Sequence, residues 1–581
     1  MKTLTIKTLK QVFDYALPYK NKILAVVLSL LALSIFGAIR PYMVKNVIDS
    51  YIETKDLDGL FWYSVLMVVV LVVEVVGQFL FTYTSNWLGQ NIIRDIRRQL
   101  FDKLMGFYQK YFDNEAVGKL ITRNISDIEN ISSIFSQGLF MIIADALRML
   151  IILIMMLYMN SKLTIIVVIF MPVLLYATRV FQQKMKVAFE EVRTQVANLN
   201  TYIQERLTGI QVVQLFAQEE ADYQKFKEIN KKHNDAWQKN ILYNSIFFPV
   251  ADILSSITLG CVIIYGGFSI LQFDGLTTTG DLFAYTMMIS MLFNPLRQIA
   301  DKFNVMQMGI IAAERVFEIL NKDEHTQPQG TIDAPDFEGD IQLKNVVFGY
   351  KEGEKVLNNL NLTIPKGKTV AIVGASGAGK STIVNLLNRF YDIQGGEIRI
   401  DNQNINDYTL ESLRKQISVV LQDVFMFNDT IFNNIALYNP AITKEQVQTA
   451  AQQIGIDSFI NSLPEGFDYV VKERGAMLST GQRQLIAFLR AYISNPSILV
   501  LDEATSSIDT HSEELIQKAL NVITKGRTSI IIAHRLATIV HADIILVMHG
   551  GKVVEQGNHD ELIAQKGYYY QLHEAQYALE E

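Results

Sequence analysis

Residues 370–381 read VAIVGASGAGKS, and this stretch decides the fold of the second half of the chain. Four apolar residues run directly into the pattern Gly-x-x-x-x-Gly-Lys-Ser, and the residues after it, up to Arg389, favour a helix. Between a strand and a helix, such a loop turns backbone N–H groups towards phosphates at the helix N-terminus. The lysine reaches the β- and γ-phosphates of a nucleotide, and the serine hydroxyl can bind Mg²⁺. The residues predicted to bind the nucleotide here are Gly374, Ser376, Gly377, Gly379, Lys380, Ser381 and Thr382.

Two further apolar runs end in residues that complete such a site. Residues 498–503 read ILVLDE, which places Asp502 and Glu503 at the end of a buried parallel strand. We predict that Asp502 binds Mg²⁺ and that Glu503 orients or deprotonates the attacking water. A third run, 528–533, is followed by His534. A lone histidine after a strand is more often structural, but parallel strands end at one edge of a sheet, so His534 is predicted to contact the γ-phosphate.

The first half of the chain reads as membrane sequence. Long apolar runs recur up to Leu296 and then give way to charged, glycine-punctuated sequence. About 20 apolar residues are needed to cross a hydrocarbon core of about 30 Å. The six predicted spans are 23–39, 60–81, 139–159, 163–176, 246–271 and 282–296. The fourth and the sixth are short, so each crosses the bilayer only if its flanks continue the helix.

The positions of lysine and arginine give the orientation, because these residues are retained on the cytoplasmic side. They occupy the N-terminal segment and the connections after the second and fourth spans, whereas the first-to-second turn is acidic and 272–281 has no basic residue. Both termini are therefore predicted to be cytoplasmic. A cleaved signal peptide is the competing interpretation of the N-terminus, but the first apolar run is long enough to span and no Ala-x-Ala-like site follows it. The connections 90–136 and 182–240 favour helices that project well beyond the bilayer.

Ionisable residues inside the predicted spans are costly and are therefore candidates for function. They are Glu74, Asp145, Arg148, Asp252 and Arg297. Asp145 and Arg148 are three residues apart and are expected to form a structural pair, while Asp252 and Arg297 are expected near the aqueous inner half. Glu74 is central in its span. We consider for it both a structural role and a place on a transport pathway, as the partner of a positively charged cargo.

The composition excludes several other classes of protein. Of 581 residues, 50% are hydrophobic and 19% charged, and 52 Lys+Arg against 59 Asp+Glu give a net charge of −7. Charge is too sparse for a disordered or collagen-like chain, and its sign argues against nucleic-acid binding. Cys261 is the single cysteine of the sequence. It can form neither an intramolecular disulfide nor a cysteine-based metal site, and among apolar neighbours it is expected to be a buried hydrophobe.

Residues 478–482 read LSTGQ, and with this motif the sequence resembles the ABC transporter superfamily, whose signature is Leu-Ser-Gly-Gly-Gln. The resemblance covers essentially the whole chain. Six spans with long intracellular extensions before one nucleotide domain look like a bacterial half-size ABC exporter of the multidrug and lipid-flippase type. The implied fold is a membrane domain of six transmembrane helices of the type IV exporter class at 1–320, a linker at 321–340 and an α/β ABC ATP-binding domain at 341–581.

The resemblance implies a role for each motif residue. Residues 374–381 match the Walker A loop, Asp502 the Walker B aspartate, Glu503 the catalytic base and His534 the switch histidine. Gln422 matches the glutamine that contacts Mg²⁺, takes part in catalysis and relays to the membrane domain. The remaining matches are Tyr350 for stacking on adenine, Ser479, Gly481 and Gln482 for the signature, 506–509 with Asp509 for the D-loop, and Glu473 with Gly475 for the exporter X-loop.

The resemblance also implies a dimer. ATP on the Walker A loop of one subunit would be covered by Ser479 and Gly481 of the other. Closure would turn the membrane halves outward, and extensions near 126–129 and 214–220 would couple the two domains. Thr480 stands where the signature usually has its first glycine, which could slow closure or indicate a different partner chain. Because Glu503, His534 and Gln422 are all present, a homodimer is favoured over a heterodimer.

The implied function is ATP-driven export or flipping of a hydrophobic or amphipathic drug or lipid across the bacterial plasma (inner) membrane by alternating access, with ATP and Mg²⁺ as cofactors. A soluble ABC ATPase would lack the spans, and an importer would normally carry its membrane part on a separate chain. One half of a heterodimeric exporter and an ATP-gated channel stay open as alternatives. The sequence does not give the substrate.

Overall fold

The computed structural model describes residues 2–272, 277–322, 330–351, 353–502, 510–532 and 539–580. The chain divides into two compact units. The membrane unit contains Met1–Met105 and Glu115–Glu324, and the nucleotide unit contains Gly106–Asn114 and His325–Glu581. A short segment from the first half of the chain, Gly106–Asn114, therefore belongs to the nucleotide unit. We call it the docked segment.

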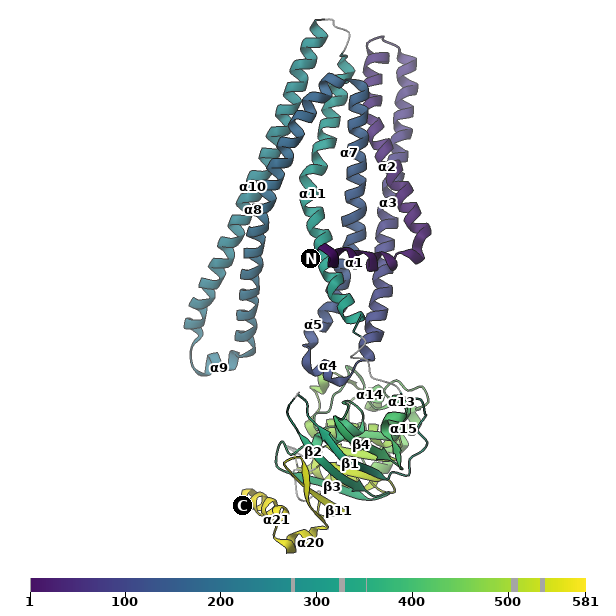
Figure 1. Ribbon diagram of the computed structural model, residues 1–581, viewed down its shortest axis with the longest axis vertical. Helices are drawn as coiled ribbons and strands as arrows, with labels where there is room; N and C mark the ends of the chain where they lie inside the picture. The colour runs from purple at the N-terminus through teal and green to yellow at the C-terminus, as the bar shows by residue number, and fades with distance from the viewer. Residues whose placement is uncertain are drawn as a thin grey trace. The chain divides into compact units, whose positions relative to one another are not determined.

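The regular secondary structure in the described residues of the membrane unit is helical, and the helices are joined by short turns. Its helices are α1 (Lys2–Asp14), α2 (Lys20–Asn46), α3 (Leu57–Met105), α5 (Val117–Thr122), α6 (Ile128–Ser133), α7 (Phe140–Met159), α8 (Ser161–Thr208), α9 (Ile210–Leu215), α10 (Glu219–Leu271) and α11 (Thr279–Leu320). Within this unit α8 and α10 run side by side and are joined by α9, while α1 runs across the long helices (Figure 1). Side-chain caps begin two of the helices: Asn160 accepts the N–H groups of Lys162 and Leu163 at the start of α8, and Thr278 with Asp281 forms a capping box at α11.

Five helical segments in the described part of the chain are long and apolar enough to cross a membrane. They are Leu17–Ile52, Leu57–Met105, Val117–Met159, Ser161–Thr208 and Glu219–Leu271. The short fourth predicted span belongs to α8, whose 48 residues supply the flanks that it needed. The sixth predicted span, 282–296, lies in the 42-residue helix α11, which is not among the five. Polar residues such as Asp281 and Asn294 dilute the apolar run of α11.

The two polar connections that the sequence predicts to be cytoplasmic differ from one another. Residues 182–240 continue α8 and α10 as long polar helices, as the sequence predicts. Residues 90–136 do not form one long helix, because α3 ends at Met105 immediately before Gly106. Glycine is a poor helix former, and the chain leaves the membrane unit at this point. The chain belongs to the membrane unit again from Glu115, shortly before α5 begins with Val117.

The nucleotide unit is built on two larger sheets. The first has the order β12-β11-β3-β10-β9-β6, in which all strands are parallel except β12 at one edge. Its strands are β3 (Thr369–Gly374), β6 (Ile417–Val420), β9 (Ile498–Asp502), β10 (Thr528–Ile532), β11 (Ile544–His549) and β12 (Lys552–Gly557). The second sheet is antiparallel in the order β2-β1-β4-β5, with β1 (Ile341–Phe348), β2 (Leu357–Ile364), β4 (Gly395–Ile400) and β5 (Gln403–Asn404). A third pair joins β7 (Asp429–Thr430) to β8 (Val470–Val471).

Helices cover the parallel sheet and complete three apolar cores. They are α12 (Lys380–Leu387), α13 (Leu410–Gln416), α14 (Ile431–Ala436), α15 (Lys444–Ile454), α16 (Asp457–Ser462), α17 (Thr480–Ile493), α18 (Thr510–Ile523), α20 (His559–Gln565) and α21 (Tyr568–Glu580), with α4 (Gln109–Asn114) in the docked segment. One core joins the two sheets around β1, β3 and α12. A second packs α14 to α18 on β9, and a third packs α20 and α21 on β3 and β11. The central strands β9 and β10 are buried on both faces, as their continuous apolar sequences predict.

Candidate nucleotide site

The parallel strands bring the predicted catalytic segments to one edge of the sheet. Strand β10 lies between β3 and β9, and Ile532 at its end is opposite both Ile372 and Asp502. Strand β6 lies on the other side of β9, with Val420 opposite Leu501. The phosphate loop after β3, the acidic end of β9 and the segments after β10 and β6 therefore all begin at this edge.

The backbone of the phosphate loop requires glycine at two positions. Gly374 has a φ of +151°, and a Cβ there would lie 2.3 Å from the carbonyl oxygen of Met548. Gly379 has a φ of +97°, stands directly before α12, and would place a Cβ 2.7 Å from Leu357. The loop is therefore packed against β11 and β2 from behind, which sets its curvature around the start of α12.

Lys380 is buried at the base of this loop. Its ammonium donates to the carbonyl oxygens of Gly374 at 2.7 Å and Ala375 at 3.1 Å, and only 5% of the residue is exposed. These bonds satisfy a buried positive charge and hold the loop in its curved form. The loop thus presents a preformed, positively charged cradle at the N-terminus of a helix.

The predicted metal ligands Ser381 and Asp502 meet across the sheet edge. The Ser381 hydroxyl donates to Asp502 Oδ1 at 3.3 Å, although the residues are 121 positions apart. A hydroxyl and a carboxylate are hard oxygen donors, which fit Mg²⁺ when nucleotide phosphates supply further oxygens. Gln422 follows two residues after β6 and is exposed. It lies at the same edge, and its contact with the metal stays a prediction.

Tyr350 lies against the helix that follows the phosphate loop. Its hydroxyl is 3.1 Å from the Thr382 hydroxyl and accepts from the Asn385 amide at 3.1 Å. The ring packs edge-on against Phe348 and Tyr391, with centroid separations of 5.0 and 5.1 Å. These neighbours hold the Tyr350 ring in place, as its predicted stacking on adenine would require. Tyr391 is not among the residues predicted for this site, although an aromatic pair three residues after the end of α12, at 390–391, is a visible signal of packing near the loop.

The signature residues form the N-terminus of α17. The Ser479 side chain accepts from the Gln482 N–H at 3.2 Å, and the Gln482 side chain accepts from the Ser479 N–H at 2.9 Å. Gln482, predicted to bind the nucleotide, thus also holds Ser479 in place. Thr480 replaces the usual glycine in the first turn, where it is exposed and its hydroxyl accepts from Arg483 at 3.1 Å. This helix tolerates threonine without a steric conflict, because a first-turn position has an ordinary helical backbone.

Three predicted site residues lie outside the described residues. They are the base Glu503, the D-loop residue Asp509 and the switch residue His534. Glu503 directly follows the last residue of β9, and His534 stands two positions after the end of β10. Their roles stay predictions.

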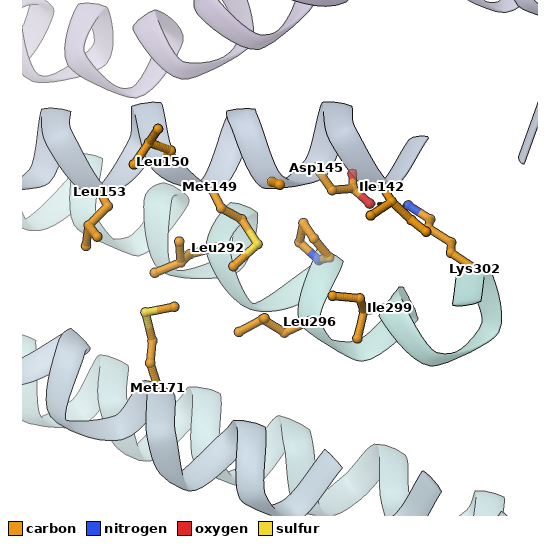
Figure 2. A pocket seen from close by; sticks show the side chains of 12 residues that line it. Ile142, Asp145, Met149, Leu150, Leu153, Met171, Leu292, Leu296, Ile299 and Lys302 are labelled. Atoms are coloured by element: carbon orange, nitrogen blue, oxygen red, sulfur yellow. Dashed lines mark hydrogen bonds and ion pairs between the residues drawn. The ribbon is translucent and has the colours of Figure 1, made fainter. Parts of the chain in front are cut away.

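The membrane unit holds a separate cavity of about 350 Å³ between α7, α8 and α11 (Figure 2). Its walls are apolar, with Met149, Met171 and Leu292 among them, and the ion pair between Asp145 and Lys302 lies at one end. The expected pairing of Asp145 with Arg148 is therefore wrong. Asp145 reaches across to α11, a contact that spacing within one helix does not reveal.

Arg148 instead lies beside Glu74, which is the residue that the sequence offered as a partner for a cationic cargo. Glu74 forms an ion pair with Arg40 at 3.6 Å. Glu74 and Arg148 also lie together against Gly37, where a Cβ would be 3.2 Å from the carboxylate and 3.9 Å from the guanidinium. One arginine thus pairs with this carboxylate, and a second lies nearby. Asp252 and Arg297 form an ion pair of their own.

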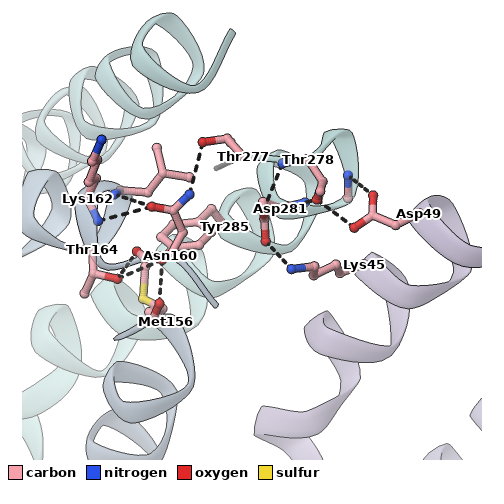
Figure 3. A network of polar contacts seen from close by, with 12 residues as sticks. Lys45, Asp49, Met156, Asn160, Lys162, Thr164, Thr277, Thr278, Asp281 and Tyr285 are labelled. Atoms are coloured by element: carbon pink, nitrogen blue, oxygen red, sulfur yellow. Dashed lines mark hydrogen bonds and ion pairs between the residues drawn. The ribbon is translucent and has the colours of Figure 1, made fainter. Parts of the chain in front are cut away.

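A polar network closes the opposite end of the membrane unit from α9 (Figure 3). Lys45 of α2 pairs with Asp281 of α11 at 2.7 Å, and Asp49 accepts from the Thr278 hydroxyl at 2.6 Å. Tyr285 is fully buried and donates to the carbonyl oxygens of Met156 and Asn160 at 2.7 and 2.6 Å. The network ties α2, α7 and α8 to α11.

The comparisons with known proteins match both units. The ABC transporter transmembrane region matches residues 23–296, and the ABC transporter domain matches residues 357–506. The ATP-dependent lipid A-core flippase of Salmonella typhimurium is 34% identical over 576 residues, which cover 99% of this chain and 98% of the relative. The chain belongs to the ABC transporter superfamily. The transporter is also 35% identical over 577 residues to the uncharacterized ABC transporter ATP-binding protein YknV of Bacillus subtilis, covering 98% of this chain and 94% of the relative.

A solved structure also matches nearly the whole chain. The structure of a bacterial Atm1-family ABC exporter with ATP bound has a TM-score of 0.79 and 26% identity, over 96% of the transporter and 99% of that chain. The transporter is a half-size exporter of the lipid-flippase-like class, with a type IV exporter-like fold. It is a multi-pass membrane protein that binds ATP and couples ATP hydrolysis to transport.

Proposed function

We propose that the transporter exports or flips an amphipathic lipid or drug-like molecule across the bacterial plasma membrane by alternating access. The contact between Ser381 and Asp502 beside the loop of Lys380 is the observation that carries the proposal. It brings a hydroxyl and a carboxylate together next to the phosphate loop, in a chain whose described part also holds five helices long and apolar enough to cross a membrane. In this proposal α11 is the sixth span, and both termini and the nucleotide unit are cytoplasmic.

The residues of the nucleotide unit divide the chemistry between them. Mg²⁺, when bound with ATP, neutralises charge on the transferred phosphoryl group. Ser381, Asp502 and Gln422 hold it in our proposal, and Tyr350 orients the adenine. Lys380 gives up its hydrogen bonds to the loop carbonyls and binds the β- and γ-phosphates instead. Glu503 takes the proton of the attacking water, and His534 fixes the γ-phosphate.

A second copy of the chain completes the site in this proposal. Ser479 and Gly481 of one subunit would cover the ATP on the loop of the other, with Asp509 at the same interface. The capped N-terminus of α17 supports this, because such a terminus carries partial positive charge that favours a phosphate. Gln422, Glu503 and His534 are all present in the one chain, which favours a homodimer. Pairing with a different half-transporter is the alternative.

The ionisable residues of the predicted spans and their partners argue against a cationic substrate. Arg40, Glu74 and Arg148 carry a formal net charge of +1, while the other pairs, Asp145 with Lys302 and Asp252 with Arg297, are neutral. We therefore replace the role of Glu74 as partner of a cation with a preference for a neutral or anionic amphipath. The lipid A-core flippases among the relatives support a lipid.

An assay in proteoliposomes tests the function against the channel alternative. We expect the wild-type chain to translocate a fluorescent phospholipid with Mg²⁺ and ATP, and Glu503→Gln to bind ATP without sustained translocation. An ATP-gated channel gives the opposite pattern, with passive ion flux on ATP binding that persists in Glu503→Gln. If the purified chain binds ATP but does not hydrolyse it, and hydrolysis appears only with a second half-transporter, the homodimer is wrong.

A further inference from the structure

The docked segment contacts the nucleotide unit through two reciprocal tyrosine–aspartate hydrogen bonds. Tyr108 of the segment donates to Asp392, and Tyr391 donates to Asp113 of the segment. Phe107 and Tyr111 are 4% and 6% exposed and anchor the segment in the unit. The segment is therefore held by buried rings, while the two hydrogen bonds at its rim determine how it sits.

Tyr391 also packs against Tyr350, the residue predicted to stack on adenine. Its ring meets that of Tyr350 at 89° with centroids 5.1 Å apart, and that of Phe348 at 5.7 Å. Tyr350 is in turn bonded to Thr382 and Asn385 at α12. The ring of Tyr391 thus packs against Tyr350, while its hydroxyl donates to Asp113 of the docked segment.

The electrostatic setting keeps both tyrosines as donors. Burial, together with the hydrogen bond to an aspartate, raises the pKa of Tyr108 and of Tyr391. Both hydroxyls therefore stay protonated across the physiological range. Gln109 donates to Asp113 at 3.0 Å and holds that carboxylate in place from within the segment.

The docked segment is covalently joined to helices of the membrane unit at both ends. The segment is joined at one end to α3, which ends at Met105, and leads at the other end to α5, which begins at Val117. The sequence resemblance implied coupling through extensions near 126–129 and 214–220, which belong to the membrane unit, and that role stays a prediction. The segment that packs within the nucleotide unit lies earlier in the chain and is marked by its aromatic residues.

We propose that Tyr391 is a positioning residue that reports the occupancy of the adenine site to the docked segment. Adenine stacked on Tyr350 fixes that ring, the ring fixes Tyr391, and the Tyr391 hydroxyl fixes Asp113. The proposal rests on the proposed function only in taking Tyr350 as the adenine residue. It assigns to the docked segment a response to the base of the nucleotide, and not to its phosphates.

Hydrogen exchange of the full-length chain in nanodiscs, in a Glu503→Gln background, tests this route. We expect Mg²⁺ and ATP to slow amide exchange in 374–382, and also in 106–114, the latter by about fivefold, or about 1 kcal/mol for a hydrogen bond. Magnesium tripolyphosphate, which has phosphates but no base, should slow exchange in 374–382 only. Tyr391→Phe keeps the ring and loses the hydroxyl, and Asp113→Ala removes the acceptor. Each should abolish the response of 106–114 and keep that of 374–382.

A matched control comes from the same unit. Tyr438 donates to Asp429 in an exposed tyrosine–aspartate hydrogen bond that belongs to neither the docked segment nor the adenine site. Tyr438→Phe should leave both responses intact. The proposal is overturned if 106–114 responds to tripolyphosphate, if both variants still respond, or if ATP protects 374–382 in the parent without a change in 106–114. Failure of lipid translocation in proteoliposomes is read separately and refutes the proposed function instead.

Discussion

Gly374 shows at the scale of one residue how the phosphate loop depends on backbone packing. A Cβ at this position meets the Met548 carbonyl at 2.3 Å, so Gly374→Ala must move β11 or the loop. We expect a loss of at least about 2 kcal/mol of stability together with ATP binding. Gly367→Ala is the control, because Gly367 also has a positive φ, +68°, but open space around its Cβ. It should cost about 1 kcal/mol and leave ATP binding unchanged. Thermal unfolding with and without ATP measures both.

Asp543 ties the start of β3 to the loop before β11. Burial raises its pKa, but the Thr369 N–H at 2.8 Å and Lys368 at 2.9 Å outweigh burial, and the net pKa is lowered. A carboxylate with a lowered folded pKa stabilises the fold above its unfolded pKa, about 3.9, and this stability is lost as pH falls through the folded value. We expect Asp543→Asn to lower the unfolding temperature at pH 7 and to flatten its decline below pH 4.

At the scale of elements, the network between α2 and α11 contains a buried carboxylate, Asp281, whose charge is balanced by Lys45. The Asp281 side chain is 2% exposed and pairs with Lys45. Lys45→Met leaves that carboxylate buried without its cation, and we expect a loss of about 3–5 kcal/mol. Adding Asp281→Asn removes the charge and keeps an acceptor for the Thr278 N–H, which is held at 3.0 Å. The double variant should therefore unfold at a higher temperature than Lys45→Met alone. If both unfold together, Lys45 does not balance Asp281.

The elements also show which features a sequence can predict. The phosphate loop, the β9 strand and the signature were predicted because each is a contiguous pattern whose geometry follows from local backbone chemistry. The pairing of Asp145 with Lys302 was missed because it depends on how α7 packs on α11, 157 positions apart in the sequence. Gln482 was assigned to the nucleotide alone, whereas its cap on Ser479 is a local motif that the sequence already contained. Aromatic residues mark Tyr391 and the docked segment only as places where side chains pack, and their pairing depends on tertiary contact that no spacing rule reveals.

At the scale of the whole molecule, the shared site of the proposed homodimer predicts complementation between inactive chains. Lys380→Ala disables the phosphate loop of one chain, and Gly481→Asp disables the signature of another. Mixed dimers have one site with both defects and one site with none. In a Glu503→Gln background, we expect neither variant alone to retain ATP through gel filtration, and the co-expressed pair to retain about a quarter of the parental amount, because half of randomly formed dimers are mixed. No retention by the mixture would mean that each chain uses its own signature.

The docked segment is synthesised long before the residues that it packs against. Asp113 and its partner Tyr391 are 278 positions apart, and Tyr108 and Asp392 are 284 apart. At about 5–20 residues per second, a ribosome needs on the order of 15–60 s to make the residues between them. For that time Phe107 and Tyr111 have no core to enter, so the nascent chain displays two aromatic side chains that the finished protein buries. We therefore expect the nascent first half to be the stage of biosynthesis that most needs a chaperone, and the nucleotide unit to complete its packing only after the ribosome has passed Asp392.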